Sequence, residues 1–99
     1  MTENEEKPIS ITEGCGNVFV DLGFPPDEAE VMLLRAMVML RMKEHVKAQG
    51  WTQAEAARRL GITQPRVSRL FRHKVEDFSL DMLLTLATRA GLHPELRIT

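Results

Sequence analysis

The sequence predicts an all-α domain of four to five helices at residues 27–99, preceded by an extended N-terminal arm at residues 1–26 and ending in an edge strand. Apolar residues recur at helical spacing over most of the domain. Thr52, Thr63 and Ser79 stand where helix N-caps are expected, and a glycine follows three of the predicted helices. A length of 99 residues suits one small domain with an arm attached.

The N-terminal arm is polar and acidic at first and then partly apolar. Residues 1–12 show no periodicity, so we expect them to be largely disordered. The segment GNVFVDLGF then alternates at period two, with one side formed by Val18, Val20, Leu22 and Phe24. This alternation indicates a short strand or an extended docking segment, which the prolines at positions 25 and 26 end.

A long helix is predicted at residues 27–49. Asp27 is placed as its N-cap with Glu30 at capping-box spacing, and Gly50 stands where a C-terminal glycine belongs. Residues 31–40 are apolar on every helical face apart from one arginine. Since a helix that is apolar all round is buried all round, we expect another chain or the N-terminal arm to cover one face.

Two short helices follow, at residues 53–60 and 64–72, with only three residues between them. Their packing requirements are visible in the sequence, because Ala57 is small enough for close approach and Gly61 permits positive φ in the turn. The apolar residues that hold the second helix are Ile62, Val67 and Leu70. This pattern predicts a helix-turn-helix, whose second helix enters the major groove of DNA.

The remaining chain is predicted to form a loop, a helix and a strand. Ser79 caps a helix at residues 80–90, which a glycine ends. The final residues LHPELRI alternate, but Pro94 restricts such a strand to a sheet edge. Because a lone edge strand is unstable, we expect it to pair with the N-terminal segment or with the same strand of a second protomer.

Charge is distributed unevenly along the chain, although the net charge is only −1. Residues 1–30 carry one base and eight acids, a net charge of −7, whereas residues 31–99 carry twelve bases and six acids, a net charge of +6. From Arg58 to Lys74 there are five arginines, one lysine and no acid. This asymmetry indicates that the two parts of the chain do different jobs.

The segment TQAEAARRLGITQPRVSRLF resembles the Xre or lambda-repressor-like helix-turn-helix. The flanking segments GNVFVDLGFPPDEAE and FSLDMLLTLATRAGLHPELRI are similar to those of HigA-like antitoxins, so the resemblance covers about residues 16–98. It implies a lambda-repressor-like fold and a sequence-specific transcriptional repressor. It further implies an antitoxin that binds a HigB/RelE-like toxin and autoregulates the pair.

The resemblance also implies roles for single residues. It places Gln53 against a DNA phosphate and against Gln64, which reads a base edge. It places Pro65, Arg66 and Arg69 at base-contacting positions and Arg72 on the DNA backbone, although Pro65 departs from the small polar residue often found there. Glutamine can pair with adenine and arginine with guanine in bidentate fashion. The predicted DNA-binding residues are Gln53, Thr63, Gln64, Pro65, Arg66, Ser68, Arg69, Arg72 and Lys74. The expected partner is a palindromic double-stranded operator bound by a homodimer.

Other interpretations of these residues stay open. The basic row of the second helix is also typical of a solvated helix face, and Arg58 and Arg59 are at least as well placed to pair with Glu55 as with phosphate. Trp51 is expected to anchor the helix connection in the core. The acidic arm is either a solubilising tail or a recognition segment, whose candidate partner-binding residues are Val18, Phe19, Val20, Leu22 and Phe24. These residues could pack on the long helix instead.

Several classes of function are not expected. The three histidines and the single cysteine lack metal-ligand spacing, and no nucleophile is paired with a base, so we expect no metal, no cofactor and no enzymatic activity. The acidic start does not resemble a signal peptide, and no segment is apolar enough to span a membrane, so we expect a cytoplasmic protein. A free-standing or phage-type regulator and a helical adaptor that does not bind DNA remain alternatives to the antitoxin.

Overall fold

The computed structural model describes residues 18–98, which form helices and no β-sheet. The elements are α1 (Val18–Asp21), α2 (Pro26–Gln49), α3 (Gln53–Leu60), α4 (Gln64–Phe71), the short 3₁₀ helix η1 (Val75–Asp77) and α5 (Leu80–Arg89). The predicted all-α class with four to five α-helices is confirmed for this part of the chain. The predicted disorder of residues 1–12 lies outside the described residues.

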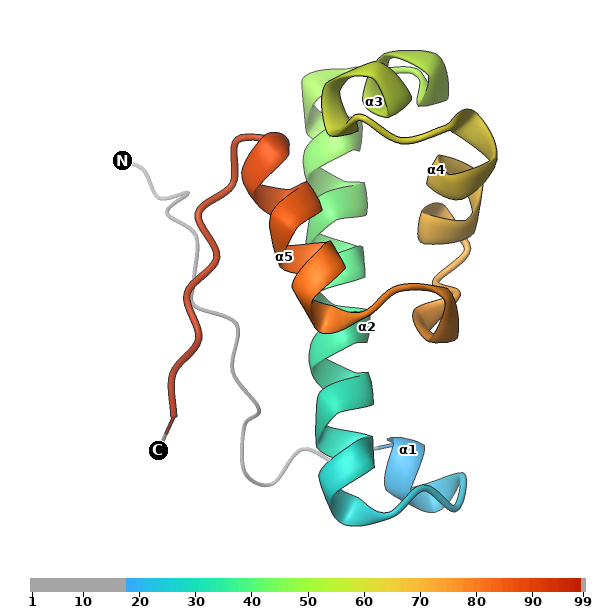
Figure 1. Ribbon diagram of the computed structural model, residues 1–99, viewed down its shortest axis with the longest axis vertical. Coiled ribbons are helices and arrows are strands. Elements are labelled where there is room, and N and C mark those ends of the chain that lie inside the picture. The colour runs from blue at the N-terminus through green and yellow to red at the C-terminus, as the bar shows by residue number, and fades with distance from the viewer. Residues whose placement is uncertain (1–17, 99) are drawn as a thin grey trace.

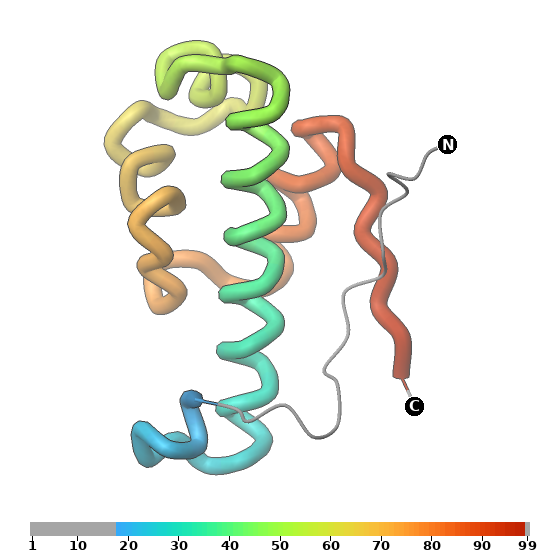
Figure 2. The backbone as a smooth tube through the Cα atoms, turned by 180° about the vertical axis from the view of Figure 1, so that it is seen from behind, coloured from blue at the N-terminus to red at the C-terminus, as the bar shows by residue number. Residues whose placement is uncertain are grey.

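The helix α2 is the central column of the molecule (Figures 1 and 2). The short α1 packs beside its N-terminal end, and α3 lies across its C-terminal end. Between these ends, α4 and α5 both contact α2, and α3 contacts both α4 and α5. The arrangement places α1 and α3 at opposite ends of one long helix, with α4 and α5 packed along it.

Three predicted N-caps are present. The Thr52 hydroxyl accepts the Glu55 N–H at 3.1 Å, the Thr63 hydroxyl accepts the Arg66 N–H at 3.4 Å, and the Ser79 hydroxyl accepts the Met82 N–H at 3.1 Å. Each bond satisfies a backbone donor that has no partner within its helix. The predicted starts of α3, α4 and α5 are therefore correct, and their ends fall within one residue of those predicted.

The core consists of two clusters joined by shared side chains. The larger cluster lies between α2, η1 and α5, with one residue each from α3 and α4, and includes the fully buried Met39, Leu60 and Leu83. The smaller one lies between α2, α3 and α4, around Val46, Ala56, Ala57 and Val67. Trp51, Ile62 and Phe71 pack against both clusters. Trp51 is thus the predicted anchor of the helix connection, and the two clusters fix α3 and α4 against α2.

The turn between α3 and α4 depends on Gly61. Its φ is 73°, a left-handed conformation that glycine adopts without steric cost, and its N–H donates to the Ala57 carbonyl at 2.8 Å. A Cβ at this position would lie 3.2 Å from Arg89 Nη1. That same Nη1 donates to the Leu60 carbonyl at 2.9 Å. The space beside Gly61 is therefore occupied by a hydrogen bond that connects α5 to the end of α3.

The predicted strand or extended segment at residues 18–24 is wrong, because this segment forms the helical turn α1. Gly23 has a φ of 101°, and its N–H donates to the Val20 carbonyl at 2.9 Å, while the Phe24 N–H donates to the Phe19 carbonyl at 3.0 Å. These two bonds make a Schellman motif, in which apolar residues five apart meet. The rings of Phe19 and Phe24 do so with centroids 6.0 Å apart, and both pack against the larger cluster.

The N-cap predicted for the long helix is also wrong. The helix α2 begins at Pro26 with Pro25 as its N-cap residue, and no side chain caps it. Asp27 lies inside the first turn, where its carboxylate accepts the neighbouring Glu28 N–H at 2.9 Å. A proline at the first helical position has a fixed φ that suits a helix and no N–H that would need a partner.

Burial around the whole of α2 is not seen. Met32, Val38 and Met39 are buried, but Val31 and Leu40 are 39% and 45% exposed. The α4, η1 and α5 elements approach α2 without surrounding it (Figure 2). The predicted cover of one face by another chain or by the arm therefore stays a prediction.

The C-terminal edge strand is not seen in the described part of the chain. Residues 92–98 are extended, with a single bridge residue at Leu96 and no ladder. Pro94 has no N–H to donate to a ladder. The tail ends in exposed apolar side chains, with Leu96 at 55% and Ile98 at 89%.

We expect Gly61→Ala to destabilise the domain more than Gly50→Ala does. Both glycines have nearly the same positive φ, 73° and 74°, so the backbone strain of about 1–2 kcal/mol is common to both changes. A Cβ at position 50 meets nothing within 4 Å, whereas one at position 61 must displace the Arg89 guanidinium, which adds up to ~1 kcal/mol. Urea unfolding measures the two losses. In an Arg89→Ala background the difference between the glycine variants should vanish, and a difference that persists would contradict this account.

Candidate nucleic-acid interface

The helix α4 is amphipathic and fixed on its inner side. Val67 and Leu70 are fully buried, and Phe71 is partly buried between the two core clusters. Residues at spacings of three, four and seven share one face of a helix. The opposite face is accordingly formed by Pro65, Ser68, Arg69 and Arg72. This outward row is held rigidly because the other side of the same helix is part of the core.

The structure brings most of the predicted DNA-binding residues together on or beside α4. Gln64 and Pro65 open the helix, Arg72 ends it, and Lys74 follows in the next turn. Side chains at seven of the nine predicted positions are exposed, and those of Arg66 and Ser68 are partly buried. Gln53 stands apart at the start of α3, and the Thr63 hydroxyl is engaged in capping α4.

Two arginines of α4 contact the turn that follows the helix. The Arg66 guanidinium lies 4.7 Å from the centroid of the Phe78 ring, a cation–π distance. The Arg69 Nη1 lies 3.9 Å from Asp77 Oδ2. Arg66 therefore lies at the edge of the outward row, stacked on the core, whereas Arg69 is 58% exposed within the row.

Asp77 and Phe78 lie in the loop that was predicted between the second short helix and the last helix, and neither was a predicted site residue. Phe78 is only 2% exposed, and Val75 in the same turn is 8% exposed, so the turn contributes to the core. An apolar residue every third position in HKVEDF is the one local signal that could have indicated this burial. The contacts with Arg66 and Arg69 depend on how the chain reverses after α4, which the sequence pattern does not specify.

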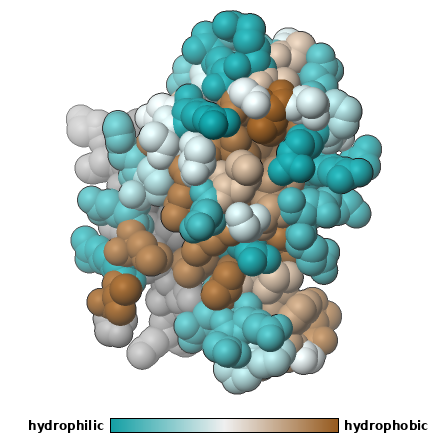
Figure 3. Space-filling model, viewed as in Figure 1, coloured by the Kyte–Doolittle hydropathy of each residue, from teal (hydrophilic) through white to brown (hydrophobic). Residues whose placement is uncertain are grey.

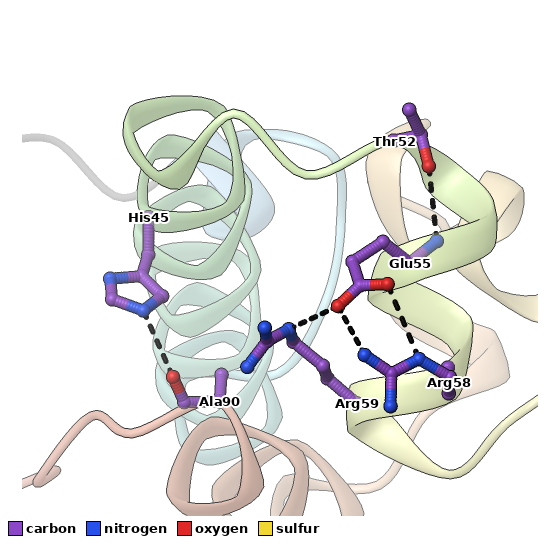
Figure 4. A network of polar contacts seen from close by, with 6 residues as sticks. All are labelled: His45, Thr52, Glu55, Arg58, Arg59 and Ala90. Carbon is purple, nitrogen blue, oxygen red and sulfur yellow. Dashed lines mark hydrogen bonds and ion pairs between the residues drawn. The ribbon is translucent and has the colours of Figure 1, made fainter.

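Both basic residues of α3 pair with the one acid of that helix, Glu55 (Figure 4). Glu55 accepts from Arg59 Nε at 2.6 Å and from Arg58 Nε at 3.2 Å, so the alternative of an ion pair holds for both arginines. These hydrogen bonds hold the pKa of the Glu55 carboxyl below its ordinary value of 4.5 and raise the pKa of Arg58. Arg59 also lies 4.6 Å from the centroid of the Trp51 ring. Glu55 offsets one of the two positive charges of α3, whereas Arg72 and Lys74 at the C-terminal end of α4 form no ion pair within the described residues.

His45 and Trp51 connect the interface to the rest of the fold. His45 Nε2 donates to the Ala90 carbonyl at 2.9 Å (Figure 4). The His45 and Trp51 rings pack in a T-shaped arrangement with centroids 5.6 Å apart. These contacts join α2, the end of α5 and the chain entering α3. The orientation of the helix-turn-helix on α2 is thus fixed by aromatic and polar contacts as well as by the core.

The candidate partner-binding residues divide into two groups. Phe19 and Phe24 turn inward, as the alternative of packing on the long helix predicted. Val18, Val20 and Leu22 are exposed to 55%, 44% and 67%, and apolar side chains are visible over α1 at the lower end of the molecule in Figure 3. Hydrophilic side chains cover the α4 side in the same view.

The comparisons with known proteins agree with the geometry. A family model described as a helix-turn-helix domain matches residues 18–99. No significant match was found to a curated protein or to a solved structure. Within residues 18–98 no helix is long and apolar enough to cross a membrane, and no group of three or more potential metal ligands occurs.

We expect the stability of the domain to depend on the charge of Glu55 at acidic pH. Because the pKa of Glu55 is lowered in the folded chain, its contribution is present above the pKa of the unfolded chain and is lost as pH falls through the folded pKa. Glu55→Gln should therefore be less stable than the wild type at pH 7, with a difference that shrinks below about pH 4.5. Urea unfolding of both proteins between pH 3 and pH 7 measures this, and a difference independent of pH would contradict it.

Proposed function

The chain belongs to a family of helix-turn-helix domains and is a DNA-binding regulator, and on that premise we propose that it is a sequence-specific transcriptional repressor without catalytic activity. The observation that carries this proposal is the outward row of α4, whose opposite face is fully buried. A rigid amphipathic helix with polar and basic residues outward is suited to enter the major groove. The row would meet base edges without any rearrangement of the core.

The residues of the outward row and those beside it have distinct proposed tasks. Gln64 would pair with adenine and Arg69 with guanine, since both side chains can make bidentate contacts with those bases. Arg72 and Lys74 would neutralise phosphates at the end of α4, and Gln53 would contact a phosphate from the start of α3. Arg66, stacked on Phe78, reaches the groove from the edge of the row. Thr63, Pro65 and Ser68 complete the surface that faces the bases.

The proposed repressor binds a palindromic operator as a homodimer. One α4 reads only a few base pairs, and paired half-sites about one helical turn apart supply the rest of the specificity in this recognition mode. The exposed Leu96 and Ile98 of the C-terminal tail offer apolar surface for such a dimer. The C-terminal tail lies on the side of α2 away from α4 (Figure 1).

Substitutions in the outward row should separate base reading from phosphate binding. Gln64→Ala and Arg69→Ala should each lose about 1–3 kcal/mol of preference for one base pair of an operator selected from random duplexes. Arg72→Ala should weaken binding to all duplexes and reduce the slope of log affinity against log salt by about 0.9. Fluorescence anisotropy titrations measure both effects, with Lys43→Ala at an exposed position of α2 as the control of equal charge change. Unchanged operator preference in Gln64→Ala, Arg66→Ala and Arg69→Ala together would reject the proposed interface.

As a finer function we propose the antitoxin of a HigB/RelE-like toxin. The resemblance to HigA-like antitoxins supports it, and so does the surface of α1, where Val18, Val20 and Leu22 are exposed without a role in the fold. Exposed acids stand next to this surface, at Asp21 and in the first turns of α2. An apolar patch with an acidic surround is complementary to the basic surface expected of an RNA-cleaving toxin.

Leu22→Asp should disrupt toxin binding without affecting DNA binding. A charge at this 67% exposed position would be buried unpaired in the proposed complex, while the core residues Phe19 and Phe24 stay in place. The assay is co-purification and relief of growth arrest with the product of an adjacent reading frame that encodes a basic RelE-like chain. Met82→Asp, at a 38% exposed position of α5 that has no proposed binding role, is the matched control. Equal neutralisation by the wild type and Leu22→Asp would exclude α1, and no complex with the wild type would favour a free-standing regulator.

A further inference from the structure

The turn after α4 folds back against the helix. His73 adopts a φ of 60°, and its N–H donates to the Leu70 carbonyl at 3.1 Å, while the Lys74 N–H donates to the Arg69 carbonyl at 3.2 Å. These bonds reverse the chain at the end of α4, as a Schellman motif does. The buried Val75 and Phe78 then fix η1 on the core, and η1 contacts α2. Asp77 is consequently held in a defined place beside α4.

Within that turn, Asp77 faces the outward row. Its Oδ2 lies 3.9 Å from Arg69 Nη1, with the two side chains 39% and 58% exposed. An ion pair this open to solvent contributes little to stability. Its position is nonetheless specific, because Arg69 belongs to the face of α4 that carries no core contact, and the carboxylate comes from an element fixed by Phe78.

A guanidinium has five N–H donors in one plane, so a carboxylate near Nη1 leaves other donors available. Guanine presents two acceptors, N7 and O6, at its major-groove edge, and an arginine fork can contact both at once. A flexible arginine loses conformational freedom when it makes such a contact, and a neighbour that already restricts it reduces that loss. A carboxylate beside the fork also disfavours its indiscriminate use on phosphates, since the two anions repel each other.

We propose that Asp77 is a specificity-determining residue, which positions Arg69 for a guanine edge and lowers affinity for nonspecific DNA. This inference rests on the proposed function, because it requires that α4 reads bases. It gives η1, which lies outside the helix-turn-helix, a role in base recognition. Asp77 acts through Arg69 and needs no contact of its own with the DNA.

The test compares Asp77→Asn with Glu76→Gln. Both changes remove one negative charge from the same turn, but Glu76 makes no ion pair within the described part of the chain, so it controls for charge alone. Operator duplexes are first selected from a random library by the wild-type protein. Affinities of the wild type and both variants are then measured on the selected duplex, on a scrambled duplex of equal length, and on duplexes with single base changes. Thermal unfolding checks that the variants fold.

Asp77→Asn should bind the scrambled duplex more tightly than the wild type does. The Arg69→Ala variant identifies the G·C pair that Arg69 reads, and Asp77→Asn should lose about fivefold or more of the preference for that same pair. Glu76→Gln should tighten binding to all duplexes equally and keep that preference. If Asp77→Asn instead behaves like Glu76→Gln, or tightens operator binding more than scrambled binding, Asp77 is no positioning residue and the inference is overturned. If the wild type selects no consensus at all, the proposed function fails first, which is a different and recognisable result.

Discussion

Burial of one side of α4 is the constraint on which the rest of the molecule depends. Val67 and Leu70 are both fully buried, yet they belong to different core clusters, one shared with α3 and the other with α2 and α5. An eight-residue helix has little stability of its own, so its orientation is set by these contacts. Because two clusters hold it, α4 can neither roll nor slide without opening one of them. The outward row is therefore preorganised, as a recognition surface requires.

The distribution of charge follows from the same arrangement. On α3 both arginines form ion pairs with Glu55, and the Arg59 guanidinium also stacks on the Trp51 ring. On α4 the helix interior contains no acid, and the only carboxylate that approaches from the described chain is Asp77 in the following turn. Positive charge is thus concentrated where Arg72 and Lys74 end the row. The net charge of the whole chain, −1, conceals this concentration.

The sequence predicted those features that depend on local chemistry. The caps at Thr52, Thr63 and Ser79 and the turn at Gly61 were predicted because hydroxyl and glycine requirements are set within a few residues. The segment around Phe19 and Phe24 was misassigned because its period-two alternation is equally compatible with a helical turn closed by Gly23, and only packing on α2 decides between them. The contacts of Phe78 and Asp77 with α4 could not be predicted, since they arise from a chain reversal at a histidine.

The separation of the two ends of α2 bears on how the proposed partners would influence each other. A helix of 24 residues is about 36 Å long, with α1 at one end, α3 at the other and α4 beside it between them (Figure 1). A protein bound to Val18, Val20 and Leu22 would not cover the outward row of the same protomer. The two surfaces share no residue, so occupation of one leaves the other open. Coupling between the proposed toxin and the operator would then act through the spacing of the two protomers on DNA.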